Sequence, residues 1–461
     1  MKTGAIILAA GDGKRMKSSR PKVMCEVLEK PMIGWVMDSL FEADFDSENI
    51  GVVVGNGAEI VSEYVNSRGV SRTFMQAERK GTGHAVMQAA EMLTLCDNVL
   101  VLYGDAPFID SDTIRKSLEA HISSESKVTV VTAEIENPTG YGRIIRDEKG
   151  NLLRITEQKD CNEQEKLIRE INSGVYWFDS RTLEAALPRL QTANAAGEYY
   201  LTDVIGITLS DGGKASAFCA DNGDIVLGAN SRRDLLRLNT IARNNVIDKH
   251  LDNGVEFVCA DGIIIGKDVV IGQDCKILPN TILRGRTTIG AGSVIGPNSI
   301  IENCTIGENA ELNNVHAYDA VLDNNVKAGP FVHLRPGTTL HSGVKIGDFV
   351  EVKNSEVGEM TCIAHLTYVG DSDVGKDVNF GCGCVTANYD GVNKFRTVIG
   401  DHAFIGCNTN LIAPVTVGAN ATTAAGSTIT RDVPADSLVI ERGQPRTIEN
   451  WEHNNKRKRK A

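Results

Sequence analysis

Residues 265–296 read IGKDVVIGQDCKILPNTILRGRTTIGAGSVIG, and an aliphatic side chain returns at every sixth position of this segment. The recurring residues are Ile265, Ile271, Ile277, Leu283, Ile289 and Ile295. The same spacing returns later in the chain at Ile399, Ile405, Leu411, Val417, Thr423 and Ile429. Neither an α-helix nor an ordinary strand has this period, whereas stacked hexapeptide coils do. The sequence therefore predicts a left-handed parallel β-helix of hexapeptide repeats, in which each recurring side chain points into a triangular prism.

The register of the repeat slips between these two runs. We expect two segments in the second half, 331–340 and 387–397, to be loops that leave the prism. Each coil of such a fold packs mainly on the coil before and the coil after it, so its stability is nearly one-dimensional.

The first half of the chain alternates strand and helix patterns instead. Apolar strands are expected at 4–10, 50–54, 99–103, 128–135 and 174–178, and helices at 32–43, 58–65, 84–93 and 112–122. This order predicts an α/β domain with a Rossmann-like, mostly parallel sheet that is covered on both faces. Ligands of such sheets bind beyond the carboxyl ends of the strands. This chain carries the loop 8–22 and the pair Gly104-Asp105 at two such ends.

The loop 8–22 reads LAAGDGKRMKSSRPK and has the chemistry of an anion site. Gly11 and Gly13 allow backbone N–H groups to approach a ligand, and the lysines and arginines that follow supply positive charge. The loop is not a Walker A sequence, and Met16 stands where the third glycine of the dinucleotide-binding fingerprint belongs. Taken by itself, it is either a polyphosphate-binding loop or a glycine-rich turn with a solvated basic face.

The composition excludes several classes of protein. The 461 residues suffice for two or three domains, and a net charge of −12 argues against a general nucleic-acid-binding protein. No apolar stretch is long enough to span a membrane, and no signal-peptide pattern starts the chain. The 11 cysteines lack the spacing of a disulfide framework, which predicts free thiols in a reducing cytoplasm. We interpret the basic run 456–460 as a solvated tail.

Leucine, isoleucine and valine recur at helical spacing between positions 235 and 251. This pattern predicts a helix that connects the two halves. We therefore expect a first domain at residues 1–230, a linking helix at 231–251 and a second domain at 252–461.

Motifs in both halves carry a resemblance to known enzymes. In the first half they are the loop 8–22, Gln76-Ala-Glu-Arg-Lys-Gly-Thr-Gly-His-Ala85, Tyr103-Gly-Asp105, Gly140-Tyr-Gly-Arg143, Glu157-Gln-Lys159, Asn172-Ser-Gly174 and Gly228-Ala-Asn230. In the second half they are His333-Leu-Arg-Pro336, Glu351-Val-Lys-Asn354, His365-Leu-Thr-Tyr-Val-Gly370 and Ala387-Asn-Tyr-Asp-Gly-Val-Asn-Lys394. The first set resembles sugar-1-phosphate nucleotidyltransferases, and the second resembles hexapeptide acyltransferases. In this order, the chain resembles the bacterial family of bifunctional N-acetylglucosamine-1-phosphate uridyltransferases and glucosamine-1-phosphate acetyltransferases.

The resemblance implies a two-step route to UDP-N-acetylglucosamine, a precursor of peptidoglycan and lipopolysaccharide. The second half would acetylate glucosamine-1-phosphate from acetyl-CoA. The first half would then transfer UMP from UTP to the product and release pyrophosphate. The resemblance also implies Mg²⁺ at the uridyltransferase site and a homotrimer, in which three prisms pack side by side and share acetyl-transfer sites.

For uridyl transfer, the resemblance implies that Arg15 stabilises the leaving pyrophosphate and that Lys22 neutralises the α-phosphate. The protein mainly positions groups and neutralises charge in such reactions. Asp105 and Asn230 would hold Mg²⁺ with oxygen ligands of the usual kind, although each residue could instead cap a following helix. Uracil would be read by Gln76, Gly81 and Thr82. The full set that would bind UTP or UDP-N-acetylglucosamine is Leu8, Ala9, Ala10, Gly11, Gly13, Lys22, Gln76, Gly81, Thr82, Tyr103, Gly104, Asp105, Gly142, Glu157, Asn172 and Asn230.

For acetyl transfer, the resemblance implies that His365 is the general base that takes a proton from the attacking amine. An imidazole suits this task because it titrates near neutral pH. The sugar phosphate would be held by Arg335, Lys353, Tyr368, Asn379 and Asn388. Acetyl-CoA would be held by Cys382, Asn388, Tyr389, Cys407, Ala425 and Arg442.

Three residues depart from the family pattern. Arg79 stands where glutamine is more common, so its side chain could stack on the base or add charge there. Cys382 and Cys407 stand where alanine and serine are common, and a thiol is a weaker hydrogen-bond donor than a hydroxyl. A cysteine acyl-enzyme is conceivable, although direct transfer to a bound amine needs none.

Two other functions remain open at this point. The chain could be a nucleotidyltransferase whose β-helix serves only assembly or regulation, or a uridyltransferase whose acetyl-transfer site has drifted. The combination of His365, Lys353, Asn388 and Tyr389 favours the bifunctional enzyme, because a purely structural prism needs none of these residues.

Overall fold

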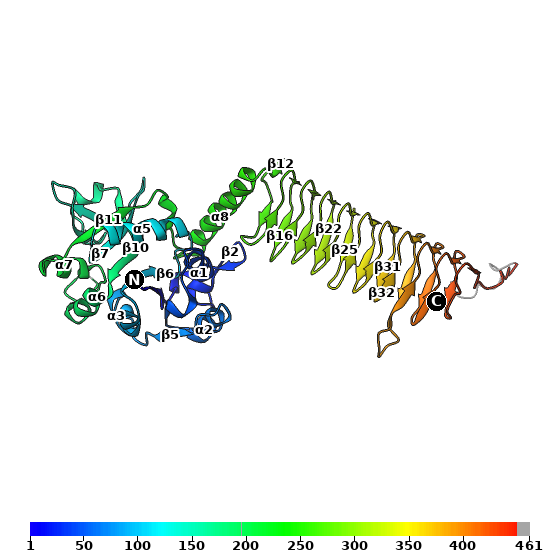
Figure 1. Ribbon diagram of the computed structural model, residues 1–461, viewed down its shortest axis with the longest axis horizontal. Helices are drawn as coiled ribbons and strands as arrows, with labels where there is room; N and C mark the ends of the chain where they lie inside the picture. Colours follow the sequence, from blue (N-terminus) through cyan, green and yellow to red (C-terminus); the bar gives the residue numbers. More distant parts are fainter. Residues whose placement is uncertain (195, 450–461) are drawn as a thin grey trace, which may run out of the picture. The chain divides into compact units, whose positions relative to one another are not determined.

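The computed structural model describes residues 1–194 and 196–449, and the chain divides into two compact units between Ala242 and Arg243 (Figure 1). The division falls inside helix α8 (Arg232–Asp252). Each unit has its own sheets and its own core, and the two are described separately below. The basic run 456–460 lies outside the described residues.

The first unit is built on a mixed, mostly parallel sheet. Its strand order is β11 (Ala215–Cys219), β7 (Val128–Glu134), β10 (Glu170–Asp179), β6 (Asn98–Tyr103), β1 (Thr3–Ala9), β4 (Ile50–Val54) and β5 (Arg72–Met75). Strand β10 runs antiparallel to both of its neighbours, whereas the other pairs in this order are parallel. A hairpin of β8 (Arg143–Arg146) and β9 (Leu152–Thr156) pairs with β10. The predicted α/β class is therefore confirmed, with the segment 174–178 inside the antiparallel β10.

Alternating side chains of β1 supply both cores of this unit. Ala5, Ile7 and Ala9 pack with residues of α1 (Met32–Glu42), α2 (Ala58–Ser67) and α5 (Ser111–Ser123). Their neighbours in β1 pack with residues of α3 (Thr82–Gln88), α4 (Glu91–Leu95), α6 (Ser180–Ala186) and α7 (Asp203–Ser210). Successive side chains of a strand point to opposite faces, so this apolar strand is covered by helices on both sides.

Most of the helix predictions for this unit are confirmed. The segments 32–43, 58–65 and 112–122 correspond to α1, α2 and α5. The single helix predicted at 84–93 is wrong, because the segment divides into α3 and α4. Ala89 leaves helical geometry at φ −100° and ψ 24°, and its buried side chain packs in the core. The local apolar pattern matches both short helices and therefore does not reveal the break between them.

The second unit is a left-handed parallel β-helix whose short strands form three sheets, one on each face of the prism (Figure 1). The first face runs from β12 (Glu256–Phe257) to β41 (Leu438–Val439). The second runs from β13 (Ile264–Ile265) to β40 (Thr428–Ile429), and the third from β14 (Val270–Ile271) to β38 (Val415–Val417). The β-helix predicted from the sixfold spacing is therefore confirmed.

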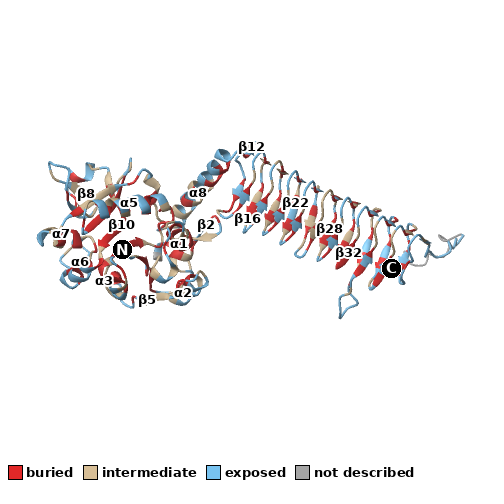
Figure 2. Ribbon diagram, in the orientation of Figure 1, coloured by how far each residue is buried: buried red, intermediate tan, exposed pale blue. Residues whose placement is uncertain are grey.

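An aliphatic ladder fills the prism, and Figure 2 shows buried residues, coloured red, recurring from coil to coil along the β-helix. It does not stop where the sequence register slips. Some turns have five residues instead of six, as between the buried Ile301 and Ile306. The buried positions that join the two regular runs are Ile301, Ile306, Leu312, Ala317, Leu322, Ala328, Leu334, Leu340, Ile346, Val352, Val357, Ile363, Val369, Val374, Phe380 and Thr386.

The prediction that 331–340 is a loop is wrong. Strands β25 (Val332–Leu334) and β26 (Thr339–Leu340) lie in this segment and pair with strands of the coils before and after them. Pro336 and Gly337, which are typical of loops, form only the corner between two faces.

The other loop prediction is confirmed. The chain leaves the prism between β34 (Val385–Ala387) and β35 (Thr397–Ile399), and a bridge between Tyr389 and Lys394 closes the excursion. Figure 1 shows this loop projecting from the stack of coils.

The correction at 331–340 can be tested by truncating the ladder there. Leu334 is 0% exposed, so Leu334→Ala should lower the free energy of unfolding by about 2–5 kcal/mol, as expected for a cavity in a packed core. Val392 in the projecting loop is 82% exposed, so Val392→Ala should change it by less than about 0.5 kcal/mol. Urea denaturation of the full chain, followed by circular dichroism, measures both. Equal stabilities of the two variants would show that 331–340 does not belong to the prism.

Candidate active sites

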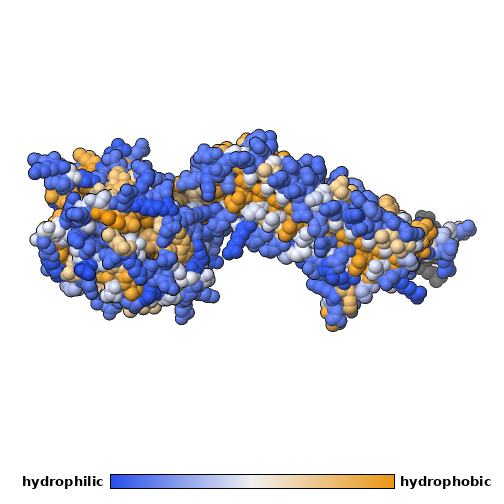
Figure 3. Space-filling model, in the orientation of Figure 1, coloured by the Kyte–Doolittle hydropathy of each residue, from blue (hydrophilic) through white to orange (hydrophobic). Residues whose placement is uncertain are grey.

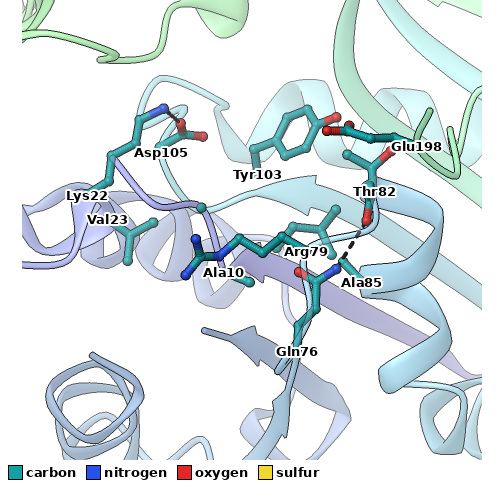
Figure 4. A pocket seen from close by; sticks show the side chains of 13 residues that line it. Ala10, Lys22, Val23, Gln76, Arg79, Thr82, Ala85, Tyr103, Asp105 and Glu198 are labelled. Atoms are coloured by element: carbon teal, nitrogen blue, oxygen red, sulfur yellow. Dashed lines mark hydrogen bonds and ion pairs between the residues drawn. The ribbon is translucent and has the colours of Figure 1, made fainter. Parts of the chain in front are cut away.

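Two cavities open in the first unit, and they share Tyr103 and Asp105 at the carboxyl end of β6. The smaller cavity, of about 280 Å³, is shown in Figure 4. Predicted ligand residues that line it are Leu8, Ala10, Gly11, Lys22, Gln76, Gly81, Thr82, Tyr103 and Asp105. The larger cavity, of about 540 Å³, is lined by Arg15, Gly142, Glu157, Asn172 and Asn230 among others. The structure thus brings residues from distant parts of the chain to one edge of the sheet.

Three of the predicted residues line neither cavity. Ala9 packs in the core on the opposite face of β1 from Leu8 and Ala10. Gly13 and Gly104 also lie outside both linings. Any contact of Ala9 with a ligand must therefore come from its backbone.

A cluster of opposite charges lies where the two cavities meet. The Lys22 ammonium forms an ion pair with the Asp105 carboxylate and donates a hydrogen bond to Asn230 Oδ1 at 2.7 Å. Figure 4 shows Lys22 reaching across to Asp105 at one end of the smaller cavity. Residues far apart in the sequence therefore place a carboxylate oxygen and an amide oxygen around one cation.

This donor set fits a hard divalent cation. The Lys22 ammonium already bridges Asp105 and Asn230, which shows that both oxygens can face one positive charge. No group of three or more His, Cys, Asp or Glu side chains suited to a metal occurs among residues 1–194 and 196–449. Magnesium needs no such cage, because it usually takes one or two protein oxygens and completes its shell with phosphates and water.

The alternative roles of these two residues as helix caps are not what the structure shows. The cap of α5 is Asp110, whose carboxylate accepts the backbone N–H of Thr113 at 2.7 Å. At the start of α8, the Ser231 hydroxyl accepts the backbone N–H of Asp234 at 3.2 Å. Asp105 and Asn230 are thus left for the cavity.

The far end of the smaller cavity is lined by polar groups of α3 and of the segment between β5 and α3. The Gln76 side chain donates to the carbonyl of Gly81 at 3.2 Å and contacts a ring nitrogen of His84 at 3.1 Å. Arg79, one of the departures from the family pattern, forms an ion pair with Asp12 of the loop 8–22. The positive charge of Arg79 is therefore balanced by the Asp12 carboxylate of the loop 8–22.

The larger cavity has a rigid wall around β10. Gly174 has φ +80°, and a Cβ placed on it would lie 2.0 Å from the Tyr103 ring, so only glycine fits there. The Asn172 amide donates to the Tyr176 hydroxyl at 2.7 Å. Burial raises the pKa of Glu157, and the nearby carboxylates of Asp160 and Asp203 raise it further.

In the second unit, most residues predicted to hold acetyl-CoA form one row. Backbone hydrogen bonds join the coils at this corner, from Gly383 N to His365 O, from Asn408 N to Cys382 O and from Gly426 N to Cys407 O. His365, Cys382, Cys407 and Ala425 are therefore stacked, and Arg442 lies in the next coil. We call this row the His365 edge. It lies between the first and second faces of the prism.

Residues predicted to hold the sugar phosphate form a second row, between the second and third faces. Arg335 follows β25, Lys353 ends β28 (Glu351–Lys353), and the backbone N–H of Asp371 bonds to the Lys353 carbonyl at 3.0 Å. The side chains of Asn354 and Asn388 both donate to the Asp371 carboxylate. We call the row of Arg335, Lys353, Asp371 and Asn388 the Lys353 edge.

Two further charged residues belong to this edge, and the sequence reasoning did not single them out. Lys394, in the projecting loop, comes close enough to Lys353 to lower the pKa of the Lys353 ammonium. Burial alone would raise the pKa of Asp371, but the Asn354 and Asn388 amides and the two ammonium groups lower it. The coil spacing could have identified Asp371, because Asn354, Asp371 and Asn388 follow one another at one-coil intervals.

The remaining predicted residues divide between the edges. The Tyr368 hydroxyl lies 3.5 Å from Asn388 Nδ2, and the exposed Tyr389 begins the loop that ends at Lys394. Both therefore belong with the Lys353 edge, and so does Asn388. Asn379 starts β33 (Asn379–Phe380) on the first face, beside Cys362 of the preceding coil. One chain thus places the two groups of residues at opposite ends of the second face.

Comparison with known proteins identifies related chains along the whole sequence. The Nucleotidyl transferase family model matches residues 4–225, and the Bacterial transferase hexapeptide (six repeats) model matches 268–303 and 396–431. The chain is 46% identical over 448 residues to the bifunctional protein GlmU of Acetivibrio thermocellus, covering 97% of this chain and 96% of that protein. It is 48% identical over 447 residues to the bifunctional protein GlmU of Caldanaerobacter subterraneus subsp. tengcongensis, covering 97% of each. A crystal structure of a putative glucose-1-phosphate thymidylyltransferase from Bacillus anthracis is similar with a TM-score of 0.44 at 21% identity, covering 52% of this chain and 96% of that chain.

The cation site at Asp105 and Asn230 can be tested by direct metal binding. With UTP present, Asp105→Asn should weaken Mn²⁺ binding by roughly tenfold or more, because a charged oxygen ligand is lost. The matched control is Asp110→Asn, which alters a helix cap outside the cavities. Electron paramagnetic resonance of free Mn²⁺ measures both variants. Equal Mn²⁺ affinities of Asp105→Asn and the wild type would exclude Asp105 as a ligand.

Proposed function

The chain belongs to the family of bifunctional GlmU proteins, and from that premise we propose how its residues perform the two transfer reactions. The enzyme acetylates glucosamine-1-phosphate from acetyl-CoA and then transfers UMP from UTP to N-acetylglucosamine-1-phosphate. The family match over nearly the whole chain supports both activities rather than uridyl transfer alone. The roles proposed for individual residues are supported by their positions. The residues predicted to bind substrates lie together at one edge of the sheet and along two edges of the prism.

For uridyl transfer, the two cavities divide the substrates between them. The smaller cavity would take UTP, with its base near Gln76 and Thr82 and its phosphates toward Lys22. The larger would take the sugar phosphate, with Glu157 and Asn172 accepting and donating hydrogen bonds to its hydroxyls. A phosphate oxygen of the sugar phosphate then attacks the α-phosphorus of UTP at the junction of the cavities, and pyrophosphate leaves.

Charge at this junction would be managed by Lys22, Arg15, Asp105 and Asn230. Asp105 and Asn230 would hold Mg²⁺ through their side-chain oxygens, and Lys22, which contacts both residues in the structure, would neutralise the α-phosphate. Bound Mg²⁺ would neutralise phosphate charge and align the triphosphate. Arg15 lines the larger cavity and would stabilise the pyrophosphate as it leaves.

For acetyl transfer, the His365 edge would hold acetyl-CoA and the general base. The C2 amine of glucosamine-1-phosphate attacks the thioester carbonyl, His365 accepts the amine proton, and coenzyme A leaves as its thiol. The Lys353 edge would hold the sugar phosphate. Arg335, Lys353 and Lys394 supply its positive charge, and an arriving phosphate relieves the repulsion that lowers the Lys353 pKa.

The separation of these edges supports an acetyl-transfer site shared between copies of the chain. The second face lies between His365 and Lys353, and its strand β31 (Tyr368–Gly370) alone spans roughly 10 Å at 3.3 Å per residue. A substrate amine beside His365 of one copy can instead have its phosphate on the Lys353 edge of a neighbouring copy. Head-to-tail contacts, in which the His365 edge of one copy meets the Lys353 edge of the next, can close into rings. We propose that three copies of this chain form such a ring, a homotrimer.

Apolar side chains beside His365 support the same assembly. Phe331, Phe349 and Leu366 occupy the corner next to the His365 edge, and each is more than half exposed. The rings of Phe331 and Phe349 stack with centroids 5.1 Å apart. Figure 3 shows apolar patches interrupting the hydrophilic surface of the β-helix. Exposed apolar side chains that lie next to one another are typical of contact surfaces. A second copy of the chain would cover Phe331, Phe349 and Leu366.

We also place the enzyme in the cytoplasm. All 11 cysteines are free thiols in the structure, as expected in a reducing compartment. The helices in residues 1–194 and 196–449 include none with the length and apolar character needed to cross a bilayer.

The role of His365 can be tested by its removal. His365→Ala should reduce the turnover number of acetyl transfer by about 10²–10⁴-fold, the usual contribution of a positioned general base. Uridyl transfer from N-acetylglucosamine-1-phosphate should persist, since its site lies in the other unit. The matched control His402→Ala removes an exposed histidine from the same β-helix and should leave both rates unchanged. Normal turnover with a raised Michaelis constant would show that His365 binds the sugar and that another group takes the proton.

A shared acetyl-transfer site can be tested by mixing two inactive chains. His365→Ala and Lys353→Ala chains should each have little acetyl-transfer activity as homotrimers. Co-expressed with different affinity tags and purified through both, they should recover about a third of the wild-type rate, because one of the three interfaces in every mixed trimer joins an intact His365 edge to an intact Lys353 edge. Recovery requires that the edges come from different copies. A mixture no more active than its components would place both edges of a site on one chain.

A further inference from the structure

The His365 edge carries two thiols in direct register. Strand β33 pairs in parallel with β36 (Phe404–Ile405), so Cys382 and Cys407, two residues beyond the paired Phe380 and Ile405, occupy corresponding positions in successive coils. The backbone N–H of Asn408 bonds to the Cys382 carbonyl at 2.7 Å. Neighbouring strands of a sheet lie roughly 4.8 Å apart, which falls within the roughly 4.4–6.8 Å range of Cα separations in disulfides.

The Cys407 sulfur lies toward the coil that carries Cys382. A Cβ placed on Gly381 would lie 2.8 Å from Cys407 Sγ, so the sulfur fills the space that the glycine leaves open. Cys407 is exposed and Cys382 is partly exposed, and both remain free thiols. Nothing in the described structure blocks a small oxidant from this part of the edge.

A third thiol nearby has a different environment. Cys384 is buried, and its Sγ–H donates to the Gly406 carbonyl at 3.1 Å. Burial raises the pKa of Cys384 to about 11, so it stays protonated and unreactive at neutral pH. The reactive members of the cluster are therefore Cys382 and Cys407.

We propose that Cys382 and Cys407 form an oxidative modification site for peroxides, at which a reversible disulfide closes the His365 edge to acetyl-CoA. One thiolate attacks a peroxide oxygen and becomes a sulfenic acid, with hydroxide as the leaving group. The second thiolate attacks that sulfur and expels a second hydroxide. Two thiols and one hydrogen peroxide thus give one disulfide and two waters. A thiol reductant reverses the reaction by exchange.

The effect on acetyl transfer rests on the proposed function of the His365 edge. The disulfide would join two successive coils on the line between His365 and Ala425, where the pantetheine arm would lie. It would also remove the Cys407 thiol as a hydrogen-bond donor. The first unit contains neither residue, so uridyl transfer should not respond.

The disulfide can be identified in the full-length enzyme after treatment with hydrogen peroxide and alkylation of the remaining thiols. Trypsin cuts after Lys376, Lys394, Arg396 and Arg431, so Cys382 and Cys407 fall in separate peptides, 377–394 and 397–431. We expect a linked pair of these peptides that disappears on reduction. Fragmentation distinguishes Cys382 from Cys384, which share a peptide. The absence of a Cys382–Cys407 link would overturn the proposal.

Activities measured on the same samples test the consequence. Peroxide should abolish most acetyl transfer and leave uridyl transfer unchanged, and dithiothreitol should restore the loss. Cys382→Ala and Cys407→Ser should each keep their own untreated acetyl-transfer rate after the same treatment. The matched control Cys219→Ala, which removes an exposed thiol of the first unit, should remain as sensitive as the wild type.

The outcomes separate the modification from the function of the edge. Peroxide sensitivity that persists in Cys382→Ala would show damage to Cys407 alone and overturn the paired site. A linked peptide with full acetyl transfer would confirm the thiol pair and contradict the placement of acetyl-CoA on the His365 edge. Protection of both thiols by saturating acetyl-CoA would support that placement.

Discussion

The stacking of coils in register is the constraint on which the second unit depends. Each buried aliphatic residue sits on its counterpart one coil away, and parallel backbone hydrogen bonds hold the coils in that register. The same register that fills the prism also aligns the residues at its corners. The His365 edge and the Lys353 edge are therefore consequences of packing inside the prism. The neighbours of a polar side chain at a corner are therefore the residues at the same corner position of the preceding and following coils.

The first unit positions its groups by a different rule. Parallel strands end at one edge of the sheet, so loops distant in sequence meet there, and Lys22, Asp105 and Asn230 converge without being close in the chain. The apolar alternation of β1 decides which side chains can reach this edge. Leu8 and Ala10 face the smaller cavity, whereas Ala9 packs in the opposite core. Neutralising charge at the junction of two cavities is what phosphoryl transfer requires.

The sequence was sufficient for the class of both units because their periods are strong. The spacing of Ile265 and its successors predicts the β-helix, and the strand and helix order of the first half predicts the α/β sheet. Prediction from the sequence was wrong where one local pattern is compatible with two structures. Five-residue turns hide the continuity of the ladder at Leu334, and nothing in segment 84–93 marks the break at Ala89. Asp371 could have been found from its one-coil spacing to Asn354 and Asn388, whereas no pattern in the sequence places Lys394 of the projecting loop beside Lys353.

The projecting loop after β34 has a consequence for how such proteins can change. The chain leaves the prism after Ala387 and returns at Thr397 in register with the coil before it, as the parallel pairing of β35 with β32 (Ser372–Val374) shows. An insertion at a corner can therefore extend outward from the prism without changing the spacing between successive coils. Lys394 gains access to the Lys353 edge in this way, while the row from Cys382 to Cys407 keeps its spacing. Loop length and loop composition can thus vary over generations independently of the scaffold, so substrate preference can drift while the fold persists.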